Sequence, residues 1–85
     1  MKYRIIVKRS VLKALKKVPR EAQIKIAGAI QSLANNPRPA QSLKLVDSIY
    51  CRIRCGNYRV IYEVQDDKLI IIILKVGHRK DIYKE

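Results

Sequence analysis

The chain has 85 residues, 48% of them hydrophobic, and its 19 Lys and Arg outnumber 7 Asp and Glu to give a net charge of +12. This length fits one small domain with a packed core, which argues against disorder. The charge implies an acidic partner: nucleic acid, an anionic membrane surface or an acidic protein. The longest apolar run, residues 69–74, is too short to span a membrane, and no secretory signal is visible.

The first part of the chain predicts a strand and two helices. Residues 1–8 contain the short apolar strand YRIIV, after which Ser10 is a candidate N-cap for an amphipathic helix over Val11–Lys17. Pro19 ends this helix and can open a longer one, whose apolar stripe runs over Arg20–Ala34. The eight Lys and Arg of residues 1–20 either solvate this helical hairpin or form a second surface that contacts nucleic acid.

The stretch Tyr50–Val64, YCRIRCGNYRVIYEV, predicts two antiparallel strands joined by a two-residue turn at Gly56–Asn57. The turn sets the cross-strand pairs: Cys55 with Tyr58, Arg54 with Arg59, Ile53 with Val60, Arg52 with Ile61, Cys51 with Tyr62, and Tyr50 with Glu63. Opposed residues share a face. We therefore expect a core face of Cys51, Ile53, Cys55, Tyr58, Val60 and Tyr62. The other face then holds Tyr50, Arg52, Arg54, Arg59, Ile61 and Glu63.

The three arginines on that second face need an explanation, because like charges opposed across a strand pair, here Arg54 and Arg59, are destabilising. A bound polyanion would supply one. The alternative is a solvated face, on which the guanidinium groups splay apart and Glu63 offsets part of the charge. We favour the anion-binding interpretation.

The two cysteines and the single histidine do not predict a disulfide or a metal site. Cys51 and Cys55 lie on one predicted strand about 13 Å apart, beyond the reach of a disulfide. Free thiols suit a reducing, cytoplasmic location. One histidine supplies too few metal ligands, so we expect neither a metal nor another cofactor.

The last strands complete an α+β fold. Asn35–Ser48 is predicted to be a loop, and Asp66–Asp67 a turn. Lys68–Val76, KLIIIILKV, predicts a central strand buried on both faces and ended by Gly77. We expect residues 1–85 to form one two-layer domain in the order strand-helix-helix-strand-strand-strand. Its two helices would pack on one face of a small, mainly antiparallel sheet, leaving the arginine face open.

The hairpin YCRIRCGNYRVIYEV, the apolar strand after it and the C-terminal VGHRKDIY resemble the RelE/ParE toxin superfamily over essentially the whole chain. The resemblance implies the toxin of a type II toxin–antitoxin pair, held inactive by a cognate antitoxin. RelE-like members cut mRNA in the ribosomal A site, whereas ParE-like members share the fold and poison DNA gyrase.

Matching RelE-like positions implies catalytic roles for Arg52, Arg54, Arg59, Arg79 and Tyr83. ParE-like toxins generally lack this full set, which favours the ribonuclease. The strand positions are arginine here, where the best-known enzymes have lysine, so the general base is open. The tail also ends two residues after Tyr83.

RNA cleavage of this kind needs a proton acceptor for the 2′-hydroxyl, stabilisation of the phosphorane and a proton donor to the leaving oxygen. Arginine suits the second task because its planar fork matches phosphate and stays charged, which also makes it a poor base. Tyr83 is the first candidate base, or it stacks on an RNA base. His78 is a further candidate, unless it only occupies a turn. Tyr50 and Lys80 are candidate RNA contacts.

Three functions stay open from the sequence. The leading one is a metal-independent, ribosome-dependent mRNA endonuclease that inhibits translation. The alternatives are a gyrase inhibitor on the same fold and a non-catalytic basic module that binds RNA or DNA. The hairpin arginines suit all three functions, whereas Arg79 and Tyr83 specifically suit the first.

Overall fold

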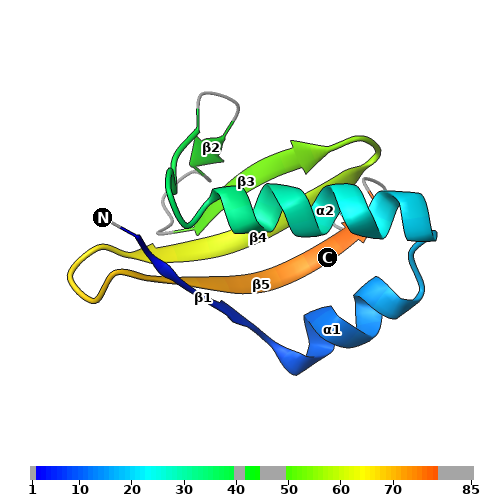
Figure 1. The fold of residues 1–85 in the computed structure, drawn as a ribbon, viewed down its shortest axis with the longest axis horizontal. Helices are drawn as coiled ribbons and strands as arrows, with labels where there is room; N and C mark the ends of the chain where they lie inside the picture. The colour runs from blue at the N-terminus through cyan, green and yellow to red at the C-terminus, as the bar shows by residue number, and fades with distance from the viewer. Residues whose placement is uncertain (1, 40–41, 45–49, 79–85) are drawn as a thin grey trace.

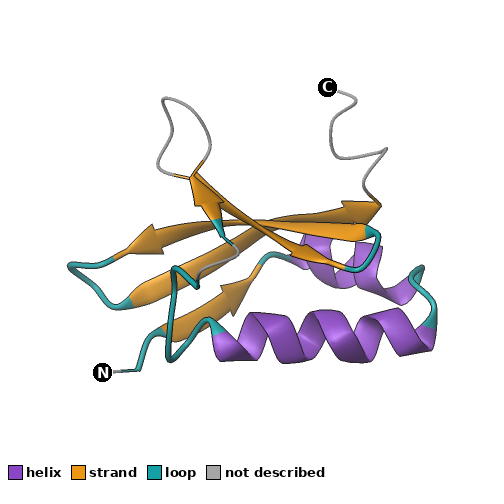
Figure 2. Cartoon of the chain, turned by 90° about the horizontal axis from the view of Figure 1, so that it is seen from above, coloured by secondary structure: helices purple, strands orange, loops and turns teal. Residues whose placement is uncertain are grey.

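A computed structural model describes residues 2–39, 42–44 and 50–78 of the chain. Figure 1 shows its elements, which are β1 (Arg4–Val7), α1 (Arg9–Lys16), α2 (Arg20–Ser32), β2 (Leu43–Lys44), β3 (Tyr50–Cys55), β4 (Tyr58–Gln65) and β5 (Ile70–His78). The five strands form one sheet in the order β1-β5-β4-β3-β2. Both helices lie on the same side of this sheet (Figure 2), which confirms the predicted two-layer α+β fold.

The hairpin of β3 and β4 has the predicted register at all six pairs, from Tyr50–Glu63 to Cys55–Tyr58. Gly56 has a φ of 60°, in the left-handed region that glycine adopts without steric cost. A two-residue turn leaves the strands little freedom to slip, so the local turn sequence was enough to predict the pairing. β4 and β5 are also antiparallel, which confirms the predicted meander.

The sheet is mainly antiparallel, as predicted, with one parallel pair, β1 with β5. β2 was not predicted, because it lies within the segment expected to be a loop; it pairs with β3. The predicted central strand, β5, is interior, but the centre of the sheet is β4. The prediction that β5 is buried on both faces is wrong for the face away from the helices. Ile71, Ile73 and Val76 on the core face are buried, whereas Ile70 and Ile72 on the other face are half-buried. β5 also continues past Gly77 to His78.

The helix boundaries differ slightly from the prediction. α1 begins at Arg9, so Ser10 lies inside its first turn, and Lys8 precedes the helix without a side-chain cap. Pro19 stands directly before α2 with a φ of −53°, close to the value that its ring imposes. α2 ends at Ser32, because the next amides, including those of Leu33 and Ala34, bond to carbonyls three residues back and tighten the final turn.

The core lies between the helices and the helix-facing side of the sheet. Its buried members are Val11, Ile26, Ile30, Leu33, Cys51, Ile53, Val60, Tyr62, Ile71, Ile73 and Val76. Cys55 and Tyr58 pack against this cluster while staying half-buried. The predicted core face of the hairpin is therefore confirmed, and the alternate face of β3 and β4 points away from the helices.

A polar cluster fixes the end of the sheet where β4 turns into β5. Arg38 donates two hydrogen bonds to Asp66, Nη2 to Oδ2 at 2.9 Å and Nη1 to Oδ1 at 3.2 Å, and Tyr3 Oη donates to Asp66 Oδ1 at 2.6 Å. We call these three residues the Asp66 clasp. The bonds from Arg38, and then that from Tyr3, lower the pKa of the Asp66 carboxyl to about 2. Tyr62 Oη also donates to the Pro37 carbonyl at 2.7 Å, so the segment before Arg38 is held against the sheet.

Candidate nucleic-acid interface

Three arginines, Arg52, Arg54 and Arg59, form an arginine cluster on the face of the sheet away from the helices. Arg54 stands directly opposite Arg59, and Arg52 stands opposite Ile61 in the next row of that face. Opposed Cβ atoms lie about 5 Å apart and diagonal residues about 7–8 Å. The three long side chains can therefore reach one anion of the size of a phosphate.

The cluster is graded in exposure. Arg54 is exposed and Arg52 half-buried, whereas Arg59 is only 5% exposed. The prediction that the whole arginine face is open is therefore wrong for Arg59. Arg59 lies on the central strand, β4, with β3 on one side and β5 on the other, whereas Arg52 and Arg54 lie on β3, nearer the edge of the sheet. A guanidinium stays charged when buried, and Arg59 makes interactions there, so it is a fixed positive charge beside the exposed Arg54.

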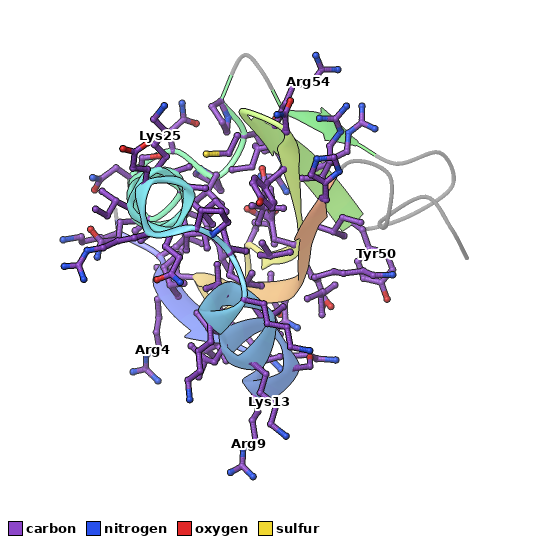
Figure 3. All side chains as sticks on the ribbon, turned by 90° about the vertical axis from the view of Figure 1, so that its right-hand side faces the viewer. Arg4, Arg9, Lys13, Lys25, Tyr50 and Arg54 are labelled. Carbon is purple, nitrogen blue, oxygen red and sulfur yellow. The ribbon has the colours of Figure 1, made fainter. Side chains whose placement is uncertain are left out.

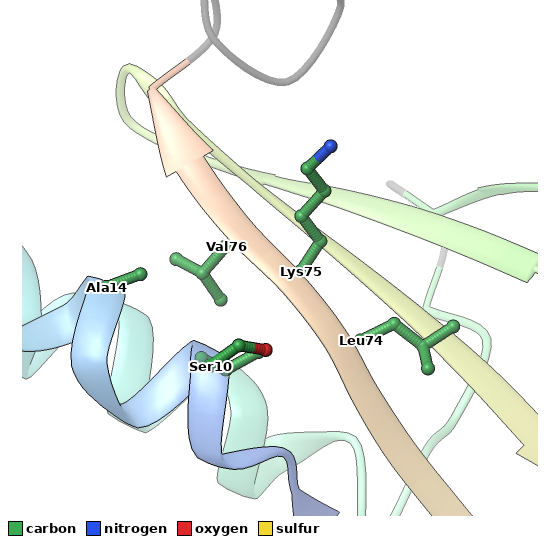
Figure 4. Close-up of a pocket in the computed structure, with 6 residues that line it drawn as sticks. Ser10, Ala14, Leu74, Lys75 and Val76 are labelled. Atoms are coloured by element: carbon green, nitrogen blue, oxygen red, sulfur yellow. The ribbon is translucent and has the colours of Figure 1, made fainter. Parts of the chain in front are cut away.

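Lys75 joins this face, although sequence reasoning missed it. Across β4 and β5, Ile61 is opposite Lys75 and Arg59 is opposite Gly77. A register shift at this point leaves Leu74 as an extra residue, so Lys75 falls on the arginine side while Val76 enters the core. Figure 4 shows Val76 pointing toward α1 and Lys75 pointing away from it. The lysine was missed because its strand was expected to be buried on both faces. The signal is the alternation along β5: Gly77 lies opposite Arg59, and Lys75, two residues before Gly77, lies on the same face.

The third row of the face has a different charge. Tyr50, 39% exposed, is opposite Glu63, and Figure 3 shows Tyr50 on the side of the sheet away from both helices. The Glu63 carboxylate accepts a hydrogen bond of 2.7 Å from Gln65 Nε2, a donor farther along β4 from the arginines. The two rows nearest the hairpin turn therefore carry the positive charge, and the third row carries the acid.

His78 occupies a different position from the arginines. It is opposite Tyr58, and the two rings meet edge to face with centroids 5.6 Å apart. Since opposed residues share a face, His78 lies on the side of Tyr58 rather than that of Arg59. Arg79, Lys80 and Tyr83 lie outside the described residues, so the roles assigned to them stay predictions.

The described part of the site is suited to binding and stabilising phosphate charge. Arginine forks match phosphate oxygens. A guanidinium stays protonated at neutral pH, so it cannot accept the proton of the 2′-hydroxyl. Within the described residues, no group of three or more His, Cys, Asp or Glu is placed to hold a metal ion. Among the described helices, none is long and apolar enough to cross a membrane.

Comparison with known proteins places this fold in a family. The family model for the ParE toxin of type II toxin–antitoxin systems, parDE, matches residues 5–83. A protein of Methanocaldococcus jannaschii with the provisional name toxin RelE1 is 38% identical over 99% of this chain and 98% of its own length.

Solved structures agree with the sequence match. In the archaeal RelE–RelB complex from Pyrococcus horikoshii, one chain superimposes with a TM-score of 0.84 at 32% identity, over 93% of this chain and 97% of that one. A chain of the intact Escherichia coli RelBE toxin–antitoxin complex has a TM-score of 0.76 at 24% identity, over 89% and 95% of the two chains, and shares the fold. The resemblance in the hairpin and the C-terminal segment is thus confirmed over nearly the full length: the chain belongs to the ParE toxin family, within the RelE/ParE superfamily of type II toxins.

Proposed function

We propose that this type II toxin is an endoribonuclease that cuts mRNA in the ribosomal A site and so inhibits translation. The observation that carries the proposal is the Arg54–Arg59 pair, in which two cations are directly opposed and one of them is buried. Directly opposed cations repel one another. A phosphate placed between the two guanidinium groups would reduce that repulsion, and its negative charge would be greatest in the transition state.

The reaction proposed is attack of the 2′-hydroxyl on the adjacent phosphorus. The 2′-oxygen–phosphorus bond forms, the bond to the 5′-oxygen breaks, one proton leaves the 2′-hydroxyl for a base and another reaches the 5′-oxygen. Arg59 would hold a non-bridging oxygen from a fixed position, with Arg52 and Arg54 closing on the same phosphate.

The proton-transfer roles rest on the family resemblance. Arg79 is assigned to the leaving group and Tyr83 to the base. His78 is a weaker candidate, because its pairing with Tyr58 sets it on the other side of the strand from Arg59. Lys80 and Tyr50 would contact the RNA outside the reacting phosphate.

A cognate antitoxin is the second partner proposed. Related chains of known structure were solved as RelE–RelB complexes, and a net charge of +12 favours an acidic partner for this chain. Gyrase inhibition is the competing function, and the observation that favours it is the match to the ParE family model.

The test is a reconstituted translation reaction with a defined message, followed by primer extension to map new RNA ends. Ends within translated codons are expected with ribosomes and not without them. A parallel supercoiling assay with purified gyrase should be unaffected. Intact messages together with inhibited gyrase would overturn the proposal in favour of the ParE-like activity, and salt-sensitive RNA binding without either effect would leave only a binding module.

Arg38→Ala is the matched control for variants of the arginine cluster. It removes the same charge as Arg54→Ala but from the Asp66 clasp at the other end of β4. Cleavage should fall with Arg54→Ala and persist with Arg38→Ala. Equal losses in both variants would indicate that net charge alone, rather than the placement of the arginines, supports activity.

A further inference from the structure

We propose that Lys75 forms a second phosphate subsite, which holds the RNA phosphate next to the one that reacts. The inference rests on the proposed function, because it concerns the same RNA strand. Its basis is the row Arg52, Ile61 and Lys75, in which one residue from each of β3, β4 and β5 lies side by side on the arginine face.

The spacing within this row separates two phosphates. Neighbouring strands lie about 4.8 Å apart, so the backbone positions of Arg52 and Lys75, two strands apart, are separated by about 10 Å. The side chain of Ile61 stands between them, half-buried and apolar. A phosphate held toward Arg52 and Arg54 on β3 lies two strands from Lys75 on β5, and the next phosphate of an extended strand would pass on the Lys75 side.

The chemistry of Lys75 fits a holding role. An ammonium is a compact point charge with three rotatable donors, so it binds phosphate without demanding one orientation, unlike the guanidinium fork. The extra residue Leu74 turns Lys75 to the arginine side of β5, and Figure 4 shows its side chain directed away from α1. The arginines would orient the reacting group, and Lys75 would contribute attraction along the strand.

The row next to it limits the path of the RNA. Glu63 repels a phosphate in the third row, so the backbone is confined to the two rows near the hairpin turn. Tyr50, opposite Glu63 and 39% exposed, stands where a base rather than a phosphate would lie, and aromatic rings stack on bases of any sequence. The strand would thus cross β3, β4 and β5 nearly at right angles.

The first experiment measures the binding of a short single-stranded RNA, with 2′-O-methyl sugars to prevent cleavage, across a series of salt concentrations. Each phosphate contact contributes about −0.7 to the slope of log K against log salt for single strands. Lys75→Ala and the longer Lys75→Gln should both reduce the steepness by about that amount. Lys68→Ala, which removes an exposed lysine in the turn between β4 and β5, should leave it unchanged. An unchanged slope in both Lys75 variants would overturn the subsite.

The second experiment measures cleavage on programmed ribosomes. Loss of a contact away from the reacting phosphate should raise KM about 3–10-fold and change kcat less than about 2-fold. A large fall in kcat with unchanged KM would also overturn the inference, since Lys75 would then act on the reacting phosphate. Thermal melts of both variants show whether they are folded. Failure of the wild-type protein to cut would refute the proposed function, while the salt series would still decide the subsite.

Discussion

Arginines near the two ends of β4 have neighbours of opposite charge. Beyond Gln65, Arg38 forms a two-bond ion pair with Asp66, at 2.9 and 3.2 Å, and Tyr3 completes the clasp. At the other end, Arg59 is opposite Arg54 on one side and Gly77 on the other. Arg38, paired with a carboxylate, is therefore suited to a structural role, whereas Arg59, opposed to another arginine, is suited to binding an anion.

The two pairs also differ in the sign of their electrostatic interaction. The Arg38–Asp66 pair is about half exposed on both sides, where ion pairs usually contribute little to stability, but its two-bond geometry is of the kind that does contribute. The Arg54–Arg59 pair places like charges together, with Arg59 5% exposed, which opposes folding. Four substitutions test whether one end serves function and the other structure.

The largest effect is expected for Arg59→Ala. Removing a fixed charge at the reacting phosphate should lower the rate of mRNA cleavage about 10²–10³-fold. The melting temperature should fall as well, because the buried stem of Arg59 also packs against its neighbours. Arg59→Lys keeps the charge and most of the stem, so it should recover stability more than activity. Full cleavage by Arg59→Ala would show that Arg59 does not act on the reacting phosphate.

Arg54→Ala should separate activity from stability. Arg54 is exposed, so cleavage should fall about 10–100-fold with little packing lost. The melting temperature should stay the same or rise, since the substitution relieves repulsion with Arg59. A clear fall in melting temperature would show that Arg54 has a structural partner, and the distinction between the two ends would weaken.

Tyr62→Phe tests the structural end. The hydroxyl donates to the Pro37 carbonyl at 2.7 Å, and burial raises its pKa to about 12. Loss of this hydrogen bond should lower the free energy of unfolding by about 1 kcal/mol, measured by urea titration, while cleavage per folded molecule stays the same. A loss of activity at unchanged stability would show that the Tyr62 hydroxyl acts in cleavage rather than in holding the structure.

The smallest effect is expected for Asp66→Asn, and it should depend on pH. The pKa of Asp66 is about 2 in the folded protein, against about 3.9 in an unfolded chain. Its contribution to stability is therefore present above about pH 4 and lost as the pH falls toward 2. Thermal melts over this range should show a shallower acid dependence for Asp66→Asn than for the wild type, with cleavage at neutral pH retained. Parallel curves would refute the clasp.

The sequence was sufficient where the determining signal is local. Gly56 and Asn57 set the hairpin register, and the register alone brought the three arginines to one face. The burial of Arg59 was not predictable in this way, because register gives the face on which a side chain lies and not how far its neighbours cover it. The same holds for the parallel pairing of β1 with β5, which joins segments far apart in the chain.

The candidate site divides similarly. The arginine cluster was predicted from the hairpin, whereas Lys75 required knowledge of a register shift that no local pattern marks. Ser10 shows the converse error: a good capping residue was assigned to a cap, but the helix begins at Arg9, two residues before the predicted start at Val11, and includes Ser10. Arg79 and Tyr83 depend on the family resemblance and stay predictions.

Leu74 is the residue that β5 could lose without changing which side chains face the core. On one side of it Ile61 pairs with Lys75, and on the other Tyr62 pairs with Ile73. Shortening a strand by one residue ordinarily turns everything beyond the deletion to the opposite face. Here deletion of Leu74 would restore regular alternation, with Ile73 inward, Lys75 outward and Val76 inward. The bulge at Leu74 therefore takes up one residue as local twist, and this keeps Lys75 on the arginine side and Val76 in the core.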